Sequence, residues 1–420
     1  MMSKLNFKVG AAALVASAFL FSCTQDEKTS QEEAAFTELD SNFDSQAIDG
    51  QYIVVYRDTE IEDVGAKYPG NYAKAQEAMA QQTKRILAEA SISDAEIVNV
   101  YSRTVNGATL KLSKAQLEQL KGKKEIKYIE QDRIVTFAPP CGTPNGGPCE
   151  DPGPDPDPVD PGTGTQETPY GILRVNGVAN YTGTNVAWVV DSGVDLDHPD
   201  LNVDASRGFN AFTSGRDGKS AVDGNGHGTH VAGTIAALNN DFGVIGVAPG
   251  ATVIPVKVLD SRGSGSYSGV IAGVDHVGAN GKSGDVANMS LGGPVSQALD
   301  DAVLAASNKG IKFALAAGNE STDANNSSPA RVNGNNIVTI SAMNSSNNWA
   351  SFSNFGNPPV DFAAPGVSVK STWKDGGYNT ISGTSMASPH AAGVLLLGAA
   401  RTDGTVNNDP DGNPDPIIVH

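Results

Sequence analysis

Three stretches in which an apolar run meets a reactive polar residue constrain the fold of this chain most strongly. In the first, the apolar run of residues 186–190 leads into Asp191, within the string WVVDSGVD. In the second, Gly-Asn-Gly precedes His227, which opens an apolar, alanine-rich run. In the third, GTSMASPH places Ser385 just before the apolar residues 386–400. The short continuous run is typical of a buried parallel strand, and the two longer runs predict helices that begin at the histidine and the serine.

These residue types together can supply a nucleophile, a general base and an orienting carboxylate. Ser385 would lie at a helix N-terminus, where a backbone N–H and partial positive charge favour an oxyanion. A parallel sheet flanked by helices brings strand ends and helix starts to one edge. We therefore expect a doubly wound α/β domain with a site suited to acyl transfer.

From about residue 170 to about residue 400 the chain resembles the subtilisin-like serine proteases, most closely their proteinase K-like branch. The motifs occur in the order Asp, His, Ser, which is the order of the subtilisin triad, and a fourth motif, AAGN, lies in register with them. The resemblance also covers the stretches VAPGATVIPVKVLD, GSGSYSGVIAGVDHV, NMSLGGP and FALAAGNE. Each motif alone is as well explained by a turn or a strand end, but four in register are not.

The resemblance implies roles for single residues. Asp191 would orient His227, which would accept the proton of the Ser385 hydroxyl and return it to the leaving amine. The side-chain amide of Asn319 and the backbone N–H of Ser385 would form an oxyanion hole. His230 lies three residues after His227, a spacing that suggests a metal pair, but no third ligand follows a recognisable pattern, so a packed histidine is favoured.

The resemblance also implies how a polypeptide substrate would bind. Two extended edges would pair with its backbone, namely Gly263, Ser264, Gly265, Ser266 and Tyr267 on one side and Ser290, Leu291 and Gly292 on the other. The wall of the pocket for the P1 side chain would be formed by Ala316, Ala317 and Gly318. Since backbone pairing gives little side-chain selectivity and these three residues include no acid, we expect broad specificity with a preference for apolar or aromatic P1 residues.

Two other classes of function remain open at this point. The chain could be an inactive, peptide-binding pseudoprotease, or its N-terminal domain could act lastingly as an inhibitor or folding chaperone. The intact motifs and Asn319 favour an active serine endopeptidase. A sedolisin-type acid protease is excluded, because that relative has Glu and Asp where this chain has His227 and Asn319.

Residues 1–23 have the features of an export signal, because Lys4 and Lys8 precede an apolar run too short to span a bilayer comfortably. The string LFSC resembles a bacterial lipobox, which implies a lipid on Cys23 and anchoring to the cell envelope. Phe21 is larger than the usual residue there, so ordinary cleavage and secretion remain the alternative. Residues 24–47 are polar and acidic, as expected of a tether.

Residues 48–137 predict a separate unit with the order β-α-β-β-α-β. The unit resembles the inhibitor-type propeptides that precede subtilisin-like domains, including its IKYIEQD stretch, and an unrelated ferredoxin-like domain is the alternative. Its last predicted strand, residues 126–135, leads into residues that could enter the active-site cleft. We therefore expect the chain to cut itself first, between about residues 134 and 168.

Two segments dense in Pro, Gly and Asp flank the predicted catalytic domain, residues 169–401. Residues 138–168 should form an extended linker, in which Cys141 and Cys149 either close a small disulfide loop or stay as thiols. Residues 402–420 are expected to be an acidic tail. The string DPDGNPD within them lacks the spacing and the closing Glu of an EF-hand calcium loop.

The formal net charge of −18 argues against nucleic acid as a partner. The expected partners are polypeptide substrates and the propeptide itself, for a monomer that touches the membrane only through a lipid on Cys23. No organic cofactor is expected. The string PPVDFAAPG resembles the family region that holds a structural Ca²⁺, which implies Asp361 as a ligand with backbone carbonyls near Asn335 and Ile337. An exposed Asp at a strand start is the alternative.

Overall fold

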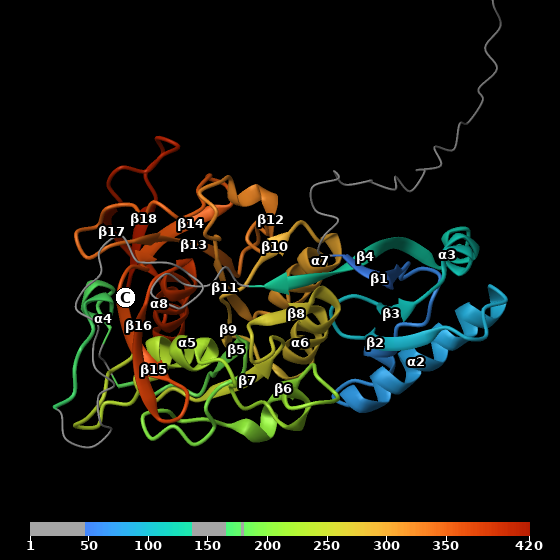
Figure 1. Ribbon diagram of the computed structural model, residues 1–420, viewed down its shortest axis with the longest axis horizontal. Coiled ribbons are helices and arrows are strands. Elements are labelled where there is room, and N and C mark those ends of the chain that lie inside the picture. Colours follow the sequence, from blue (N-terminus) through green and yellow to red (C-terminus); the bar gives the residue numbers. More distant parts are fainter. Residues whose placement is uncertain (1–46, 137–164, 178–179) are drawn as a thin grey trace, which may run out of the picture. The chain divides into compact units, whose positions relative to one another are not determined.

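The computed structural model describes residues 47–136, 165–177 and 180–420, and Figure 1 shows it as a ribbon. The predicted export signal with Cys23, nearly all of the predicted tether, and the linker cysteines Cys141 and Cys149 lie outside the described residues. In the described ranges, no helix combines the length and the apolar character needed to cross a bilayer.

The N-terminal domain is an antiparallel sheet with helices packed on it. Its elements are β1 (Ala47–Tyr56), α1 (Val64–Lys67), α2 (Tyr72–Glu89), β2 (Glu96–Tyr101), β3 (Gly107–Lys111), α3 (Lys114–Lys121) and β4 (Ile126–Thr136). The strands lie in the order β2-β3-β1-β4. Ser113 caps α3 through a reciprocal pair of hydrogen bonds with Gln116. Apart from the added short helix α1, this is the predicted β-α-β-β-α-β arrangement.

The second domain is built on a large parallel sheet. Its strands lie in the order β17-β18-β14-β13-β11-β9-β5-β7-β6, and only the β17–β18 pair is antiparallel. The strands of this sheet are β5 (Ala187–Asp191), β6 (Phe209–Asn210), β7 (Val253–Lys257), β9 (Val286–Met289), β11 (Lys312–Ala316), β13 (Ile337–Met343), β14 (Val360–Pro365), β17 (Arg401–Thr405) and β18 (Pro416–Val419).

Helices cover both faces of this sheet (Figure 1). They are α4 (Tyr170–Arg174), α5 (His227–Ala236), α6 (Tyr267–Asn280), α7 (Gln297–Ser307) and α8 (Thr384–Leu397), and short strands outside the sheet are β8 (Ser264–Ser266), β10 (Gly293–Pro294), β12 (Ser327–Ser328), β15 (Val369–Trp373) and β16 (Gly377–Ile381). Along β5, Ala187 and Val189 pack with residues of α5 and α8, whereas Trp188 and Val190 pack with residues of α6 and α7. Burial on both faces explains the continuous apolar run, and the doubly wound α/β fold is confirmed.

Residues 402–420 are not the acidic tail that their composition predicts. β18 pairs in parallel with β14 and antiparallel with β17, and the side chains of Ile417 and Ile418 are fully buried. The acidic residues between the two strands form the turn, where the Asp409 carboxylate accepts the backbone N–H groups of Asp411 and Asp415. The Pro, Gly and Asp content therefore describes a turn, and the apolar run after it forms a strand.

The predicted linker also ends earlier than residue 168. The Gln166 side chain donates to the carbonyls of Leu238 and Val244, and the backbone N–H of Glu167 donates to the carbonyl of Gly243. Residues 166 and 167 are therefore attached to the second domain, through hydrogen bonds to the loop of residues 238–244.

The two domains share a sheet edge and an apolar core. β4 continues beyond its partner β1 and pairs antiparallel with β8, so that Val135 lies opposite Gly265. Alternate residues of β1 face opposite sides, and Ile53 and Val55 join the apolar cluster that also holds residues of α6 and α7. The N-terminal domain therefore covers helices of the second domain and reaches the predicted substrate-binding edge.

Candidate active site

The end of β5 and the start of α5 bring two of the predicted residues together. Asp191 is fully buried and His227 is 1% exposed. The imidazole Nδ1 lies 2.8 and 3.0 Å from the two carboxylate oxygens of Asp191. The helix approaches the turn after β5 closely, since a Cβ on Gly228 would lie 2.0 Å from the carbonyl oxygen of Gly193. A carboxylate only accepts hydrogen bonds, so Nδ1 carries a proton, and in the neutral form of the ring the lone pair is then on Nε2.

Asp223, which no motif singles out, fixes the start of α5. Its Oδ1 accepts hydrogen bonds from the Ser192 hydroxyl and the Gly226 N–H, and its Oδ2 accepts from the N–H and hydroxyl of Thr229. Gly226 has a φ of 117°, and a Cβ there would lie 2.3 Å from the ring of Trp373. The one sequence signal for this role is an Asp just before a helix start, a position that favours capping.

The first turn of α8 carries Ser385, which is 4% exposed. Its hydroxyl donates to the carbonyl of Ser290 at 3.2 Å, and the Ser290 hydroxyl donates to the carbonyl of Ser385 at 2.7 Å. The Asn288 amide donates to the same Ser290 hydroxyl at 2.8 Å and accepts from the hydroxyl of Ser388 at 2.8 Å. Ser290, predicted to pair with substrate, is buried and supports the start of α8.

Asn319 follows β11, and α8 orients its side chain. Its Oδ1 accepts from the backbone N–H of Thr384 at 2.8 Å and from the Thr384 hydroxyl at 2.9 Å. The point that a Cβ on Gly383 would occupy lies 3.5 Å from Asn319 Nδ2 and 3.7 Å from the backbone nitrogen of Ser385. Two N–H donors therefore flank one small space at the N-terminus of a helix, where the dipole favours negative charge.

A cavity of about 410 Å³ adjoins Ser385 and Asn319. Its lining includes five residues that were predicted to bind substrate, Leu291, Gly292, Ala316, Ala317 and Gly318. The lining also includes an acid, Glu320, which the sequence analysis did not place there. Glu320 is exposed, and its carboxylate accepts from the Asn354 amide at 2.7 Å.

Asn354 is a further residue that sequence reasoning missed. It is fully buried, and its Oδ1 accepts from the backbone N–H groups of Glu320 and Thr322, both at 3.0 Å. Its amide also donates to the carbonyl of Ala317 at 3.0 Å. One side chain thus orders the loop that forms the pocket wall, and its partners lie more than thirty residues away in the chain.

The predicted edge at residues 263–267 is occupied by the N-terminal domain. Ser264, Gly265 and Ser266 form β8 and pair with residues 134–136 of β4, whose last described residue, Thr136, lines the cavity. Gly263 lies in the turn before β8. Tyr267 is not part of the edge, because Ser266 caps α6 by accepting from the N–H of Gly269, so that the helix begins at Tyr267 and buries its ring.

Two further histidines of the motifs are packed in the interior. His230 Nε2 donates to the carbonyl of Val369 at 3.0 Å, and His390 Nδ1 donates to the carbonyl of Met386 at 2.8 Å. Burial lowers the pKa of His230 to about 3 and that of His390 to about 4. Both rings therefore stay neutral, as expected of packed histidines.

The residues predicted to hold calcium lie on neighbouring strands. Asp361 is on β14, and its Oδ2 accepts from the backbone N–H of Thr339 on β13 at 2.9 Å. Asn335 lies in the turn that leads into β13, and Ile337 is the first residue of that strand. Nowhere in residues 47–136, 165–177 and 180–420 do three or more His, Cys, Asp or Glu side chains gather in an arrangement that could hold a metal ion.

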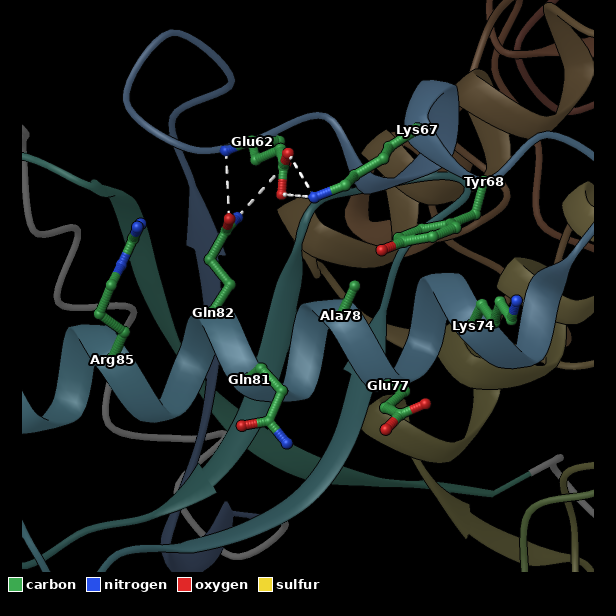
Figure 2. A pocket seen from close by; sticks show the side chains of 9 residues that line it. All are labelled: Glu62, Lys67, Tyr68, Lys74, Glu77, Ala78, Gln81, Gln82 and Arg85. Atoms are coloured by element: carbon green, nitrogen blue, oxygen red, sulfur yellow. Dashed lines mark hydrogen bonds and ion pairs between the residues drawn. The ribbon is translucent and has the colours of Figure 1, made fainter.

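A second hollow lies on the N-terminal domain between the segment around α1 and the helix α2, and Figure 2 shows its lining. Lys67 and Gln82 point toward Glu62, which pairs with Lys67 at 2.7 Å and donates its backbone N–H to Gln82 at 3.1 Å. The lining is polar and charged, and none of the predicted site residues belongs to it.

Known proteins match both domains. Residues 182–407 match the model of the subtilase family, and residues 51–138 match that of peptidase inhibitor I9. The chain is 39% identical over 366 residues to alkaline serine exoprotease A of Vibrio alginolyticus, a match that covers 84% of this chain but only 61% of that protein. It is 42% identical over 303 residues to subtilisin E of Bacillus subtilis, with 70% of each protein covered.

Two more relatives agree with this. The extracellular serine proteinase of a Thermus species is 38% identical over 364 residues, which cover 84% of this chain and 80% of that protein. The crystal structure of a cold-adapted subtilisin-like serine proteinase matches with a TM-score of 0.51 and 39% identity, over 60% of this chain and 97% of that one. The chain therefore belongs to the subtilase family, as a subtilisin-like serine protease with an I9 inhibitor domain before its catalytic domain.

Proposed function

We propose that this serine endopeptidase is a self-processing zymogen in which Asp191, His227 and Ser385 form the catalytic triad. The 2.8 Å hydrogen bond between Asp191 and His227 Nδ1 carries the proposal. It leaves the lone pair on Nε2, the form of the ring that a general base requires. The same carboxylate stabilises the imidazolium that forms once the base has taken a proton.

The reaction follows from these roles. The Ser385 hydroxyl leaves the Ser290 carbonyl, gives its proton to His227 Nε2 and attacks the peptide carbonyl carbon. Asn319 Nδ2 and the Ser385 N–H donate to the oxyanion of the tetrahedral intermediate. The C–N bond then breaks as the imidazolium returns the proton to the leaving amine. Water hydrolyses the resulting acyl-enzyme by the same steps, with His227 again as the base.

Self-processing is supported by the course of β4. A strand tethered to the enzyme and paired with β8 has a high effective concentration at the site, so its own junction should be cut before dilute substrates are. Thr136 already lines the cavity beside Ser385. The junction is proposed between about residues 134 and 168, and the cleaved domain acts as an inhibitor until it is released.

The test compares wild type with Ser385→Ala in a host that lacks other proteases. In subtilisin the loss of the nucleophile costs about 10⁶ in kcat, so the variant should retain its N-terminal domain while wild type runs smaller. A fluorophosphonate should label wild type at Ser385. Maturation of Ser385→Ala at the wild-type rate would disprove self-processing, and failure to label would favour a pseudoprotease. Retention of the N-terminal domain in the active form would favour a lasting inhibitor role.

The proposed specificity is broad, with apolar or aromatic side chains preferred at P1. The cavity wall is formed largely by small or apolar residues, and its acid, Glu320, is exposed and held by Asn354. An exposed carboxylate in water attracts a cation only weakly. Apolar contact should therefore outweigh charge in the choice of P1 residue.

A structural Ca²⁺ is proposed at Asp361. The donors there are a carboxylate and backbone carbonyls near Asn335 and Ile337, which are the hard oxygen ligands that Ca²⁺ takes. Burial raises the pKa of Asp361, and a bound cation would offset that cost. Millimolar Ca²⁺ should raise the Tm of Ser385→Ala relative to EDTA, by mass action on the folded state. An equal Tm, or an unchanged response in Asp361→Asn, would contradict this site.

Export is proposed from the signal-like residues 1–23 and from the Thermus relative, whose name describes it as extracellular. The proposal includes a lipid on Cys23 that anchors the protein to the cell envelope, and secretion is the alternative. Incorporation of labelled palmitate into wild type but not into Cys23→Ser would support the lipid anchor.

A further inference from the structure

A lysine without exposed surface lies beside the proposed triad. Lys257 is the last residue of β7 and pairs with Asp191 across the sheet. Its Nζ donates to the carbonyls of Ser192 at 2.6 Å and Leu259 at 2.9 Å, and lies 3.2 Å from Oδ1 of Asp217. An ammonium group has three hydrogens, so these three acceptors satisfy it.

One end of this arrangement reaches the catalytic carboxylate. The backbone N–H of Ser192 donates to Oδ1 of Asp191 at 2.7 Å, while the carbonyl of Ser192 accepts from Lys257. The hydroxyl of Ser192 donates to Asp223, which caps the helix that begins at His227. The lysine therefore holds Ser192, which contacts both the Asp191 carboxylate and Asp223.

The other end reaches the substrate-binding edge. Asp217, at the start of the short 3-10 helix η3 (Asp217–Lys219), accepts from the backbone N–H of Ser261 at 3.0 Å and from its hydroxyl at 3.2 Å. Ser261 lies in the turn whose ends, Asp260 and Ser264, are joined by a 2.8 Å backbone hydrogen bond. Ser264 is the first residue of β8. The carboxylate thus holds the turn from which the edge strand begins.

We propose that Lys257 and Asp217 are a positioning pair that sets the proposed catalytic carboxylate and the β8 edge in register with each other. This inference rests on the proposed function. A substrate strand on β8 must present its carbonyl to Ser385 while Asp191 orients His227. The Lys257–Asp217 ion pair connects the segment after Asp191 with the turn before β8.

Stability alone gives a weak reason for such a pair. Burial of the Lys257 charge is costly, because Lys257 has no exposed surface while Asp217 is 19% exposed, and apolar replacements of buried ion pairs are often neutral or stabilising. A positioning role makes a distinct prediction, because each single substitution leaves one charge without its partner. Lys257→Met leaves the negative Asp217, and Asp217→Asn leaves the positive Lys257. The other titratable groups near His227, namely Asp191, Asp223 and His230, stay the same in every variant.

The test compares Lys257→Met, Asp217→Asn and the double variant with wild type. Lys370→Met is the matched control, because it removes a lysine paired with Glu167 outside the site. Fluorophosphonate titration counts the active sites, so that kcat refers to folded enzyme only. KM is measured with an extended peptide and with a single-residue ester, and kcat/KM is measured against pH.

Both single variants should lose about tenfold or more in kcat per titrated site, the scale of a small misplacement of reacting groups. Asp217→Asn should also raise KM for the extended peptide but not for the ester, which does not pair with β8. The acidic limb of the pH profile should move up in Lys257→Met and down in Asp217→Asn, by roughly half a unit each, and should return in the double variant.

Limbs that stay in place, or that move in the same direction in both single variants, would overturn the positioning pair, even where Tm falls. Should Lys257→Met fail to fold, the isosteric Asp217→Asn decides through its downward limb and its KM split. A wild type that fluorophosphonate does not label would instead defeat the proposed function, which is a different result.

Discussion

Two side chains of the proposed site use one atom to hold their position and leave another for the proposed chemistry. Asn319 accepts from Thr384 through Oδ1, which directs Nδ2 toward the space beside the Ser385 N–H. His227 likewise binds Asp191 through Nδ1, which leaves Nε2 for the proposed proton transfer. Isosteric substitutions can therefore separate the position of a side chain from its reactivity.

Asn319→Asp should lower kcat about 10²–10³-fold with little change in KM, the loss found on removal of such a donor in subtilisin. The aspartate keeps an oxygen for Thr384 but replaces the N–H donor with a second oxygen. Steady-state kinetics per titrated site would check this, with the exposed Asn202→Asp as a control. A tenfold or smaller loss would mean that Asn319 does not bind the oxyanion.

Glu320→Gln should lower kcat/KM a few-fold for a Lys P1 substrate and leave a Phe P1 substrate within twofold of wild type, as expected for one exposed charge. The amide keeps the shape of the side chain and its contact with Asn354. A peptide-library profile measures both. A wild-type profile dominated by Arg or Lys would contradict the proposed apolar preference.

At the residue scale, a sequence prediction is sharpest where candidate chemistry and local structure coincide. Asp191, His227 and Ser385 each end or begin an apolar run, so one window predicts both the candidate group and its element, and the structure confirms the elements. Lys257 and Asn354 escape notice because their role lies in hydrogen bonds to partners distant in the chain. A buried lysine and a loop asparagine have no signature of their own.

At the element scale, β4 serves as more than an edge strand. The backbone N–H of Ala298, in the first turn of α7, donates to Glu130 at 3.1 Å, and that of Ser268, in the first turn of α6, donates to Asp132 at 3.1 Å. Helix N-termini have unpaired N–H groups and favour anions. Alternate residues of one propeptide strand thus cap two helices of the catalytic domain.

This interface should weaken as pH rises. Burial raises the pKa of Glu130 from 4.5 to about 7, and the nearby Asp300, whose pKa burial raises to about 6, adds repulsion. Because the bound pKa exceeds the free one, the affinity contributed by Glu130 is complete below about 4.5 and is lost as pH rises through about 7. The loss should reach roughly a hundredfold.

The measurement uses Ser385→Ala nicked between residues 137 and 164, followed by gel filtration at about pH 5.5, inside this window, and at about pH 8.5, above it. More propeptide should co-elute at the lower pH. Glu130→Gln keeps an acceptor for the Ala298 N–H but does not titrate, so it should flatten the difference. An equally steep dependence in Glu130→Gln would assign the effect to other groups.

Element types follow from the sequence where periodicity is strong, as in the propeptide and in the buried strands of the large sheet. Composition misleads at the C-terminal end. The proline, glycine and aspartate residues between Thr405 and Pro416 form a turn. Their composition nevertheless leads to the prediction that all of residues 402–420 are a tail. Residues 416–419 form a strand that pairs with β14, a partner more than fifty residues earlier in the chain. A local sequence pattern cannot predict such a pairing.

At the scale of the whole molecule, the C-terminal strand β18 joins the main sheet between β14 and β17. Ile417 packs in a buried cluster with Met343, Ala363 and Val406, and Asp415 accepts from the Ser341 hydroxyl at 2.6 Å. The Ser341–Asp415 hydrogen bond joins residues 74 positions apart in the chain. The last strand therefore contributes to the stability of the catalytic domain.

Ile417→Ala in the Ser385→Ala background should lower the free energy of unfolding by about 2–5 kcal/mol, the usual cost of truncating a buried isoleucine. Removal of residues 401–420 should cost more, since it also uncovers β14. Thermal melts would measure both, with Leu173→Ala, at a residue 59% exposed, as a control. Melting temperatures equal to the parent would restore the tail interpretation.

The shared apolar cluster has a consequence for the mature enzyme. Ile53, Val55, Tyr101, Val105 and Val135 of the propeptide pack among residues of α6 and α7, so one interior spans both domains. Release of the propeptide turns that interior into exterior and leaves a water-exposed apolar face beside the catalytic cleft. Another protein domain with an apolar sheet face and an unpaired last strand would be able to pack on α6 and α7 and to pair with β8. Release of the propeptide thus exposes a surface, made of α6, α7 and the β8 edge, to which an inhibitor of the mature enzyme can bind.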